Sequence, residues 1–91
     1  MTSPDSAELA LRPGAVTWRE VDGEAILLDL GSSEYLGVNA SGTVLWQMLD
    51  AGTTERELVA ALQERFGVPA DAARTDVDAF LTAARERNLL A

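Results

Sequence analysis

SSEYLGVNASGTVLWQML, residues 32–49, joins an expected strand to an expected helix with no linker between them. The run that begins at Tyr35 is strand-like, and Asn39 is a residue type that often caps helices. Apolar residues then recur at helical spacing over residues 44–49. Such a junction fixes a sheet edge rigidly against a helix. We expect this edge to be the working surface of the protein.

Upstream of the junction, the sequence predicts two more strands. Alternation over residues 16–21 indicates a strand with one half-buried face, and Asp22-Gly23 is a strong hairpin signal. The return segment, residues 24–30, is almost continuously apolar, which indicates a central strand covered on both sides. With residues 34–38 as a third strand, the sheet is an antiparallel meander whose third strand lies at an edge.

Downstream, the sequence predicts three helices. The first covers about residues 40–50, the second begins at the capping box Thr54–Glu57, and the third covers about residues 70–87. The third helix carries an apolar stripe at Ala73, Val77, Phe80, Leu81 and Ala84. The order βββααα predicts an α+β domain in which a three-stranded antiparallel sheet is followed by a three-helix bundle, in a winged-helix-like arrangement.

The length and composition of the chain limit its chemistry. Its 91 residues make one small domain, and we expect residues 1–12 to form a disordered N-terminal tail before a folded domain at 13–91. The sequence has no Cys, His or Lys, which removes thiolate metal sites, the usual general base and Schiff-base chemistry. The clustered carboxylates lie in first helical turns or on polar faces. We therefore expect no enzyme activity, no metal site and no cofactor.

The charge of the chain also excludes classes of partner. The formal net charge is −8, and the seven Arg residues are scattered among acidic residues, so nucleic-acid binding is not expected. No apolar run approaches the ~20 residues needed to cross a bilayer. The N-terminus lacks the basic and hydrophobic regions of a signal peptide. We expect a cytoplasmic protein that does not bind membranes.

A series of short motifs runs through most of the chain. In order, they are Tyr35-Leu36-Gly37-Val38-Asn39, Gly42, Trp46, Leu49-Asp50-Ala51-Gly52, Asp76-Val77-Asp78-Ala79-Phe80-Leu81 and Asn88-Leu89-Leu90. Together they resemble the PqqD-like family, the leader-recognition domains (RiPP recognition elements) that act on ribosomally made, modified peptides. The resemblance covers about residues 16–90, and it departs from the family at Val38 and Asn88, where Leu and Gly are usual. The stand-alone members from lasso-peptide clusters look most similar.

The resemblance implies that the domain binds the leader of a precursor peptide as an extra strand on the third strand, in a groove bordered by the third helix. It also implies partners, a leader peptidase of the cysteine protease class and a macrolactam cyclase. An exposed sheet edge independently suits such strand addition. Two alternatives remain open, a PqqD-like peptide chaperone for a radical-SAM enzyme and a winged-helix regulatory module.

The expected peptide site joins the third strand to one face of the third helix. On the strand, alternation directs Leu36 and Val38 to one face and Tyr35 and Gly37 to the other. On the helix, positions 74, 78, 81 and 85 form a stripe that borders the core stripe. The predicted leader-binding residues are Glu34, Tyr35, Leu36, Gly37 and Val38 with Arg74, Val77, Asp78, Leu81 and Arg85.

Overall fold

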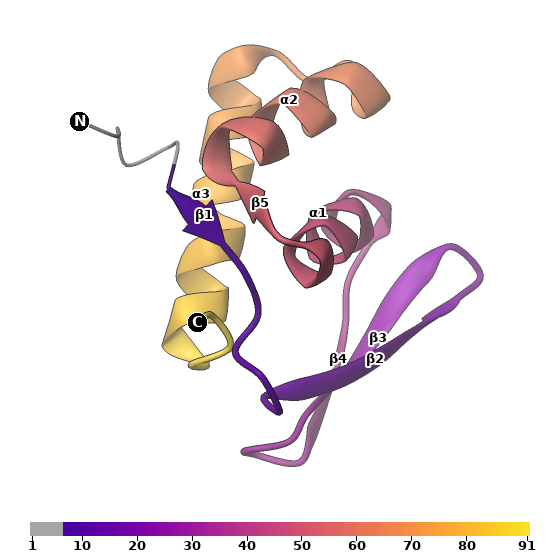
Figure 1. Ribbon diagram of the computed structural model, residues 1–91. Coiled ribbons are helices and arrows are strands. Elements are labelled where there is room, and N and C mark those ends of the chain that lie inside the picture. Colours follow the sequence, from indigo (N-terminus) through magenta and orange to yellow (C-terminus); the bar gives the residue numbers. More distant parts are fainter. Residues whose placement is uncertain (1–6) are drawn as a thin grey trace.

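The structure of the chain, a computed structural model, describes residues 7–91 (Figure 1). Strands β2 (Val16–Val21), β3 (Glu24–Asp29) and β4 (Glu34–Gly37) form an antiparallel sheet in the order β2-β3-β4. Asp22 and Gly23 have φ values of 52° and 83°, as the two central residues of a type I′ hairpin turn require. The predicted meander, with β4 at an edge, is confirmed.

Helices α1 (Ala40–Ala51), α2 (Glu55–Phe66) and α3 (Ala70–Glu86) follow the sheet. The Asn39 side chain caps α1 by accepting a hydrogen bond from the backbone N–H of Gly42 at 2.9 Å. A Cβ at Gly42 would lie 3.1 Å from the Cβ of Val38, so the absence of a side chain there lets α1 start close to β4. Thr54 caps α2 through the N–H of Glu57 at 3.2 Å. The predicted α+β order is confirmed.

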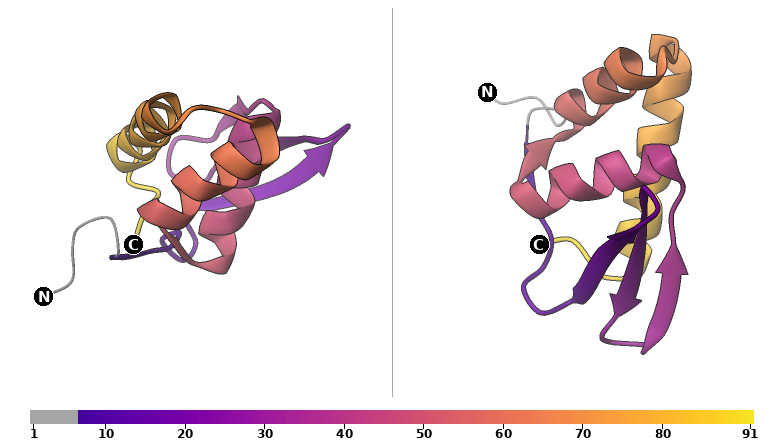
Figure 2. Two further views of the ribbon diagram at one scale, coloured as in Figure 1. Left: turned by 90° about the horizontal axis from the view of Figure 1, so that it is seen from above. Right: turned by 90° about the vertical axis from the view of Figure 1, so that its right-hand side faces the viewer.

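The helices all pack on one side of the sheet, and the core lies between the two layers (Figures 1 and 2). Its largest fully buried side chains are Trp46, Leu49, Leu58, Leu62, Val77 and Leu81. From the sheet, Ala25 and Leu27 of β3 point into this core. Between residues 7 and 91, no helix is long and apolar enough to span a membrane.

The N-terminal segment differs from the predicted tail. Strand β1 (Glu8–Leu9) pairs antiparallel with β5 (Thr53–Thr54), the short strand between α1 and α2. The side chains of Leu9 and Leu11 pack on the core, and the backbone of Leu11 bridges to Leu90. The prediction of disorder is therefore wrong for residues 8–12, because their apolar positions dock against elements far along the chain. The part of that prediction that concerns residues 1–6 lies outside the described residues.

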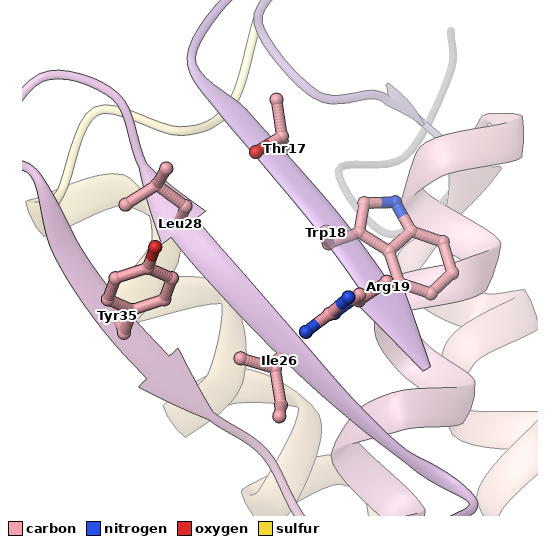
Figure 3. Close-up of a pocket in the computed structure, with 6 residues that line it drawn as sticks. All are labelled: Thr17, Trp18, Arg19, Ile26, Leu28 and Tyr35. Atoms are coloured by element: carbon pink, nitrogen blue, oxygen red, sulfur yellow. The ribbon is translucent and has the colours of Figure 1, made fainter. Parts of the chain in front are cut away.

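The cover of the central strand also differs from the prediction. Strand β3 is central, but its alternate side chains are not fully covered, because Ile26 is 37% exposed and Leu28 is half-buried. The expectation of cover on both sides is wrong because no described helix packs on the second face. Ile26 and Leu28 lie there with Tyr35 of β4, on the face of the sheet away from the helices, which we call the outer face (Figure 3).

Candidate functional site

The free edge of β4 is the first part of the candidate site. Within residues 7–91, β4 pairs only with β3. The N–H of Val38 donates to the carbonyl of Ala25 at 3.1 Å, toward β3. Because backbone groups of successive residues in a strand point to opposite sides, the N–H and C=O groups of Tyr35 and Gly37 point to the open edge. This edge can therefore hydrogen-bond an added strand without any rearrangement of the sheet.

A narrow groove between β4 and α3 is the second part. Its volume is about 120 Å³, and it is lined by Leu27, Leu36, Val38, Phe80, Ala83, Ala84, Arg87 and Leu89. The right-hand view of Figure 2 shows β4 and α3 on the same side of the domain. Leu36 and Phe80 are half-buried, and Ala83 is exposed. The groove thus offers an apolar floor beside the row of open backbone groups.

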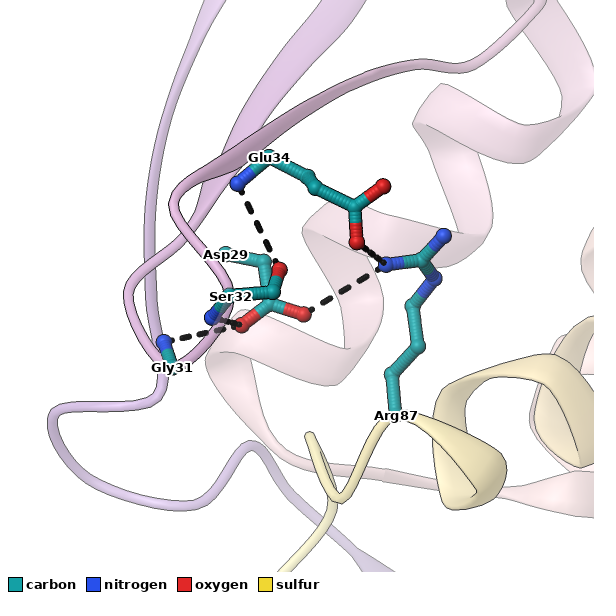
Figure 4. Close-up of polar contacts among 5 residues, drawn as sticks. All are labelled: Asp29, Gly31, Ser32, Glu34 and Arg87. Carbon is teal, nitrogen blue, oxygen red and sulfur yellow. Dashed lines mark hydrogen bonds and ion pairs between the residues drawn. The ribbon is translucent and has the colours of Figure 1, made fainter.

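An ionic cluster links the two walls of the groove (Figure 4). Nη1 of Arg87, just after α3, lies 3.3 Å from Oε1 of Glu34 and 3.6 Å from Oδ2 of Asp29. The Asp29 side chain is 7% exposed and accepts hydrogen bonds from the N–H groups of Gly31 at 3.0 Å and Ser32 at 3.3 Å. These contacts tie the end of α3 to the β3–β4 turn and hold the groove walls at a set spacing.

The charge state of Asp29 follows from the same contacts. Desolvation by burial raises the pKa of this carboxyl, but hydrogen bonds from the backbone of Ser32 and Gly31, a hydrogen bond from the Ser32 side chain and the charge of Arg87 together outweigh it. The net effect lowers the pKa of Asp29 below its ordinary value of 3.8. Asp29 is therefore a carboxylate at neutral pH and can hold Arg87 in place.

The strand half of the predicted site lies as expected. Glu34, Tyr35, Leu36 and Gly37 form β4, and Val38 follows it directly. Leu36 and Val38 face the helices and line the groove, whereas the Tyr35 side chain is 75% exposed on the outer face. Whether these residues bind a peptide remains a prediction.

The helix half of the predicted site lies differently. Val77 and Leu81 are 0% and 1% exposed in the core, so neither offers a surface to a ligand. Arg74 and Asp78 line hollows beside Glu55 of α2, away from β4. Arg85 is exposed and lines neither these hollows nor the groove beside β4.

Besides the buried Ala84, the side chains of α3 that line the groove are those of Phe80 and Ala83, and Arg87 follows on the same stripe. This stripe and the predicted stripe at positions 74, 78, 81 and 85 lie on opposite sides of the core stripe. Measured around the helix axis, with about 100° per residue, the two stripes are roughly 200° apart. Periodicity locates the core stripe but does not say which flank faces the sheet edge. A signal was present in the sequence, because Phe80, Ala83 and Arg87 recur at helical spacing.

Comparisons with known proteins agree with this geometry. A profile of the family described as coenzyme PQQ synthesis protein D (PqqD) matches residues 24–90, which include both walls of the groove. A solved structure of TbiB1 in complex with the TbiA(beta) leader peptide is 30% identical, with a TM-score of 0.80, and the match covers 89% of this chain and 93% of that chain. A lasso peptide synthetase B1 complexed with the leader peptide is 27% identical, with a TM-score of 0.79 and coverage of 93% and 99%. A search of curated proteins finds no match.

Proposed function

The chain belongs to the PqqD family, and from this premise we propose that it binds the leader region of a ribosomally synthesised precursor peptide as an added strand along β4. The observation that supports the proposal is the open edge at Tyr35 and Gly37 beside the apolar groove. Added strands gain affinity from backbone hydrogen bonds and specificity from pockets for alternate side chains. The edge and the groove offer these two parts of the interaction side by side.

The magnitudes of the two parts indicate that the groove decides affinity. Hydrogen bonds to the open groups of Tyr35 and Gly37 would contribute about 0.5–1.5 kcal/mol each. Ordering each peptide residue costs about 1–2 kcal/mol of backbone entropy. The backbone hydrogen bonds alone therefore do not hold a flexible peptide on β4. Each apolar side chain that enters the groove would add about 1.5–3 kcal/mol, and a few such anchors make binding favourable.

The size of the groove favours one kind of anchor. An engineered apolar cavity of roughly 150 Å³ takes up benzene, and the groove here measures about 120 Å³. We infer that the groove takes one apolar side chain of moderate size as its main anchor. It would contact Leu36 and Phe80, with Ala83 leaving the entrance open because its side chain is small.

We further propose that the peptide is a lasso precursor and that the domain, without catalysis of its own, delivers it to a leader peptidase and a macrolactam cyclase. The similarity to two B1 proteins solved with leader peptides supports the peptide class. The absence of Cys, His and Lys supports a binding role. Processing of a leader by the purified chain alone would contradict this role.

A matched pair of substitutions on α3 tests the proposed groove. Ala83→Glu places a carboxylate in the groove, whereas Thr82→Glu places the same charge on the neighbouring exposed position, which does not line it. Calorimetric titration with a synthetic lasso-precursor leader that the wild type binds should show affinity lost in the first variant and kept in the second. Equal affinity in both variants would contradict the groove assignment. A preference of the wild type for the leader of a radical-SAM-modified precursor would contradict the lasso assignment.

A further inference from the structure

The turn that follows α3 carries part of the groove wall. Arg87 and Leu89 both line the groove, and Asn88 lies between them with a φ of 59°. The N–H of Leu89 donates to the carbonyl of Ala84 at 2.9 Å, which is the longer hydrogen bond of a Schellman motif. This motif ends a helix with one residue of positive φ, the place that Asn88 takes. We call residues 87–89 the wall turn.

Two carbonyl groups of the wall turn lie beyond the hydrogen bonds of α3, and Arg12 donates to both of them. Nε of Arg12 donates to the carbonyl of Asn88 at 2.8 Å, and its backbone N–H donates to the carbonyl of Leu89 at 2.7 Å. The contact extends to the neighbouring residues, because the N–H of Ala91 donates to the carbonyl of Ala10 at 2.9 Å. Figure 1 shows the chain between β1 and β2 passing beside the C-terminal end. The N-terminal segment thus holds the wall turn.

Arg12 can act on the groove only through the wall turn, since it is exposed and does not line the groove itself. The turn, in contrast, contributes two side chains to the groove. Arg87 reaches Oε1 of Glu34 in β4 at 3.3 Å, and Leu89 is buried beneath the groove. Helix ends open easily where their terminal groups lack partners. A wall turn released by Arg12 would therefore move Arg87 and Leu89 together.

The position of the wall affects binding because the groove is small. Its volume of about 120 Å³ lies between β4 and the last part of α3, so a displaced wall turn changes the space left for a peptide side chain. A site that has to become ordered when the ligand arrives also binds more weakly, whereas a site already in its bound conformation avoids that loss. Contacts that fix the wall turn in the free protein should therefore raise affinity.

We propose that Arg12 is a positioning residue of the leader-peptide groove, which holds the wall turn in the conformation that receives the peptide. The inference rests on the proposed leader binding, and it extends the binding unit to the N-terminal segment. Residue 12 lies before the residues 24–90 that match the family profile, so the match assigns no role to it. Arg12 contributes two hydrogen bonds at a distance from the peptide rather than a contact with it.

Arg12→Met and Arg12→Gln form a matched pair that tests the side-chain hydrogen bond. Both substitutions remove the positive charge and keep the backbone N–H. Nε2 of Gln occupies the same place along the side chain as Nε of Arg and can donate to the carbonyl of Asn88, whereas Met has no donor there. Affinity for a synthetic lasso-precursor leader that the wild type binds, measured by fluorescence anisotropy, should fall about three- to tenfold in Arg12→Met. Arg12→Gln should bind the leader like the wild type.

Val59→Ala is the control for a general loss of stability. Val59 of α2 is buried in the core and does not line the groove, so its truncation should lower the melting temperature and leave leader affinity unchanged in the folded protein. Amide hydrogen exchange gives a second readout that needs no peptide. The N–H of Leu89 should exchange faster in Arg12→Met than in the wild type, whereas the N–H of Leu62 in α2 should exchange at the wild-type rate.

Wild-type leader affinity in a folded Arg12→Met protein would overturn the positioning role. An equal loss in Arg12→Gln would overturn it too, because the loss would then follow the charge of Arg12 and not its hydrogen bond. An equal loss in Val59→Ala would assign the effect to stability alone. A wild type that binds no such leader would instead remove the proposed function. Unchanged exchange at Leu89 in Arg12→Met would refute the hold on the wall turn even then, so the two failures are distinguishable.

Discussion

Gly37→Pro tests whether the peptide joins the sheet through its backbone. The substitution removes one N–H that points to the open edge and leaves the inward bond from Val38 to Ala25 in place. A peptide carbonyl that loses this donor costs about 1–3 kcal/mol. At about 1.4 kcal/mol per tenfold change, affinity for the leader should fall about 5- to 150-fold.

Gly37→Ala is the matched control, since a Cβ at this position meets no atom within 4 Å and the N–H is retained. Its affinity should remain close to wild type. Leader affinity is measured by fluorescence anisotropy, with circular dichroism and thermal melting to show that both variants keep the fold. Pro is tolerated on edge strands whose N–H faces solvent, so we expect the fold to persist. A folded Gly37→Pro protein that binds the leader with wild-type affinity would refute strand addition and favour capture by side chains alone.

Two further predictions concern stability. Leu81→Ala should lower the free energy of unfolding in urea by about 2–5 kcal/mol, because Leu81 is fully buried; a change near zero would contradict its place in the core. The lowered pKa of Asp29 means that its carboxylate stabilises the fold fully at neutral pH, and that this contribution is lost as the pH falls below 3.8 through the lower pKa of the folded state. Asp29→Asn should therefore be less stable than wild type at neutral pH, and thermal melts should converge in acid; a constant difference across this range would contradict the ionic role.

The parts of the fold that sequence reasoning predicted depend on local chemistry. Asp22 and Gly23 suit the positive φ of the hairpin turn, and the side chains of Asn39 and Thr54 cap the helices that follow them. Each signal acts over two to four residues, within reach of hydrogen bonds inside one turn. The element order follows from these boundaries. The pairing of β1 with β5 depends instead on two segments that are about 45 residues apart in the sequence, since Glu8 pairs with Thr54. No local pattern encodes such a pairing.

The candidate site was predicted only in its strand half, for a similar reason. Alternation along β4 allows either of its two faces to point to the core. The apolar side chains of Leu36 and Val38 identify the core-facing one. A helix that borders a core has two flanks, and polar residues occur on both. On α3, Arg74 and Asp78 lie on the flank toward α2, and Ala83 lies on the flank toward β4. Only the packing of α3 beside the sheet selects the flank, and that depends on long-range contacts.

The misjudged cover of β3 has a different origin, because there the local pattern and the isolated fold disagree. Natural sequences are largely consistent from local pattern to tertiary environment, and departures concentrate where function demands them. Ile26 and Leu28 occupy positions whose side chains, in a strand of this composition, are normally buried, yet Ile26 is 37% exposed and Leu28 is only half-buried. Exposing this face is unfavourable for the isolated domain. The outer face is thus the place where the residue pattern of β3 and the environment that the single chain gives it disagree.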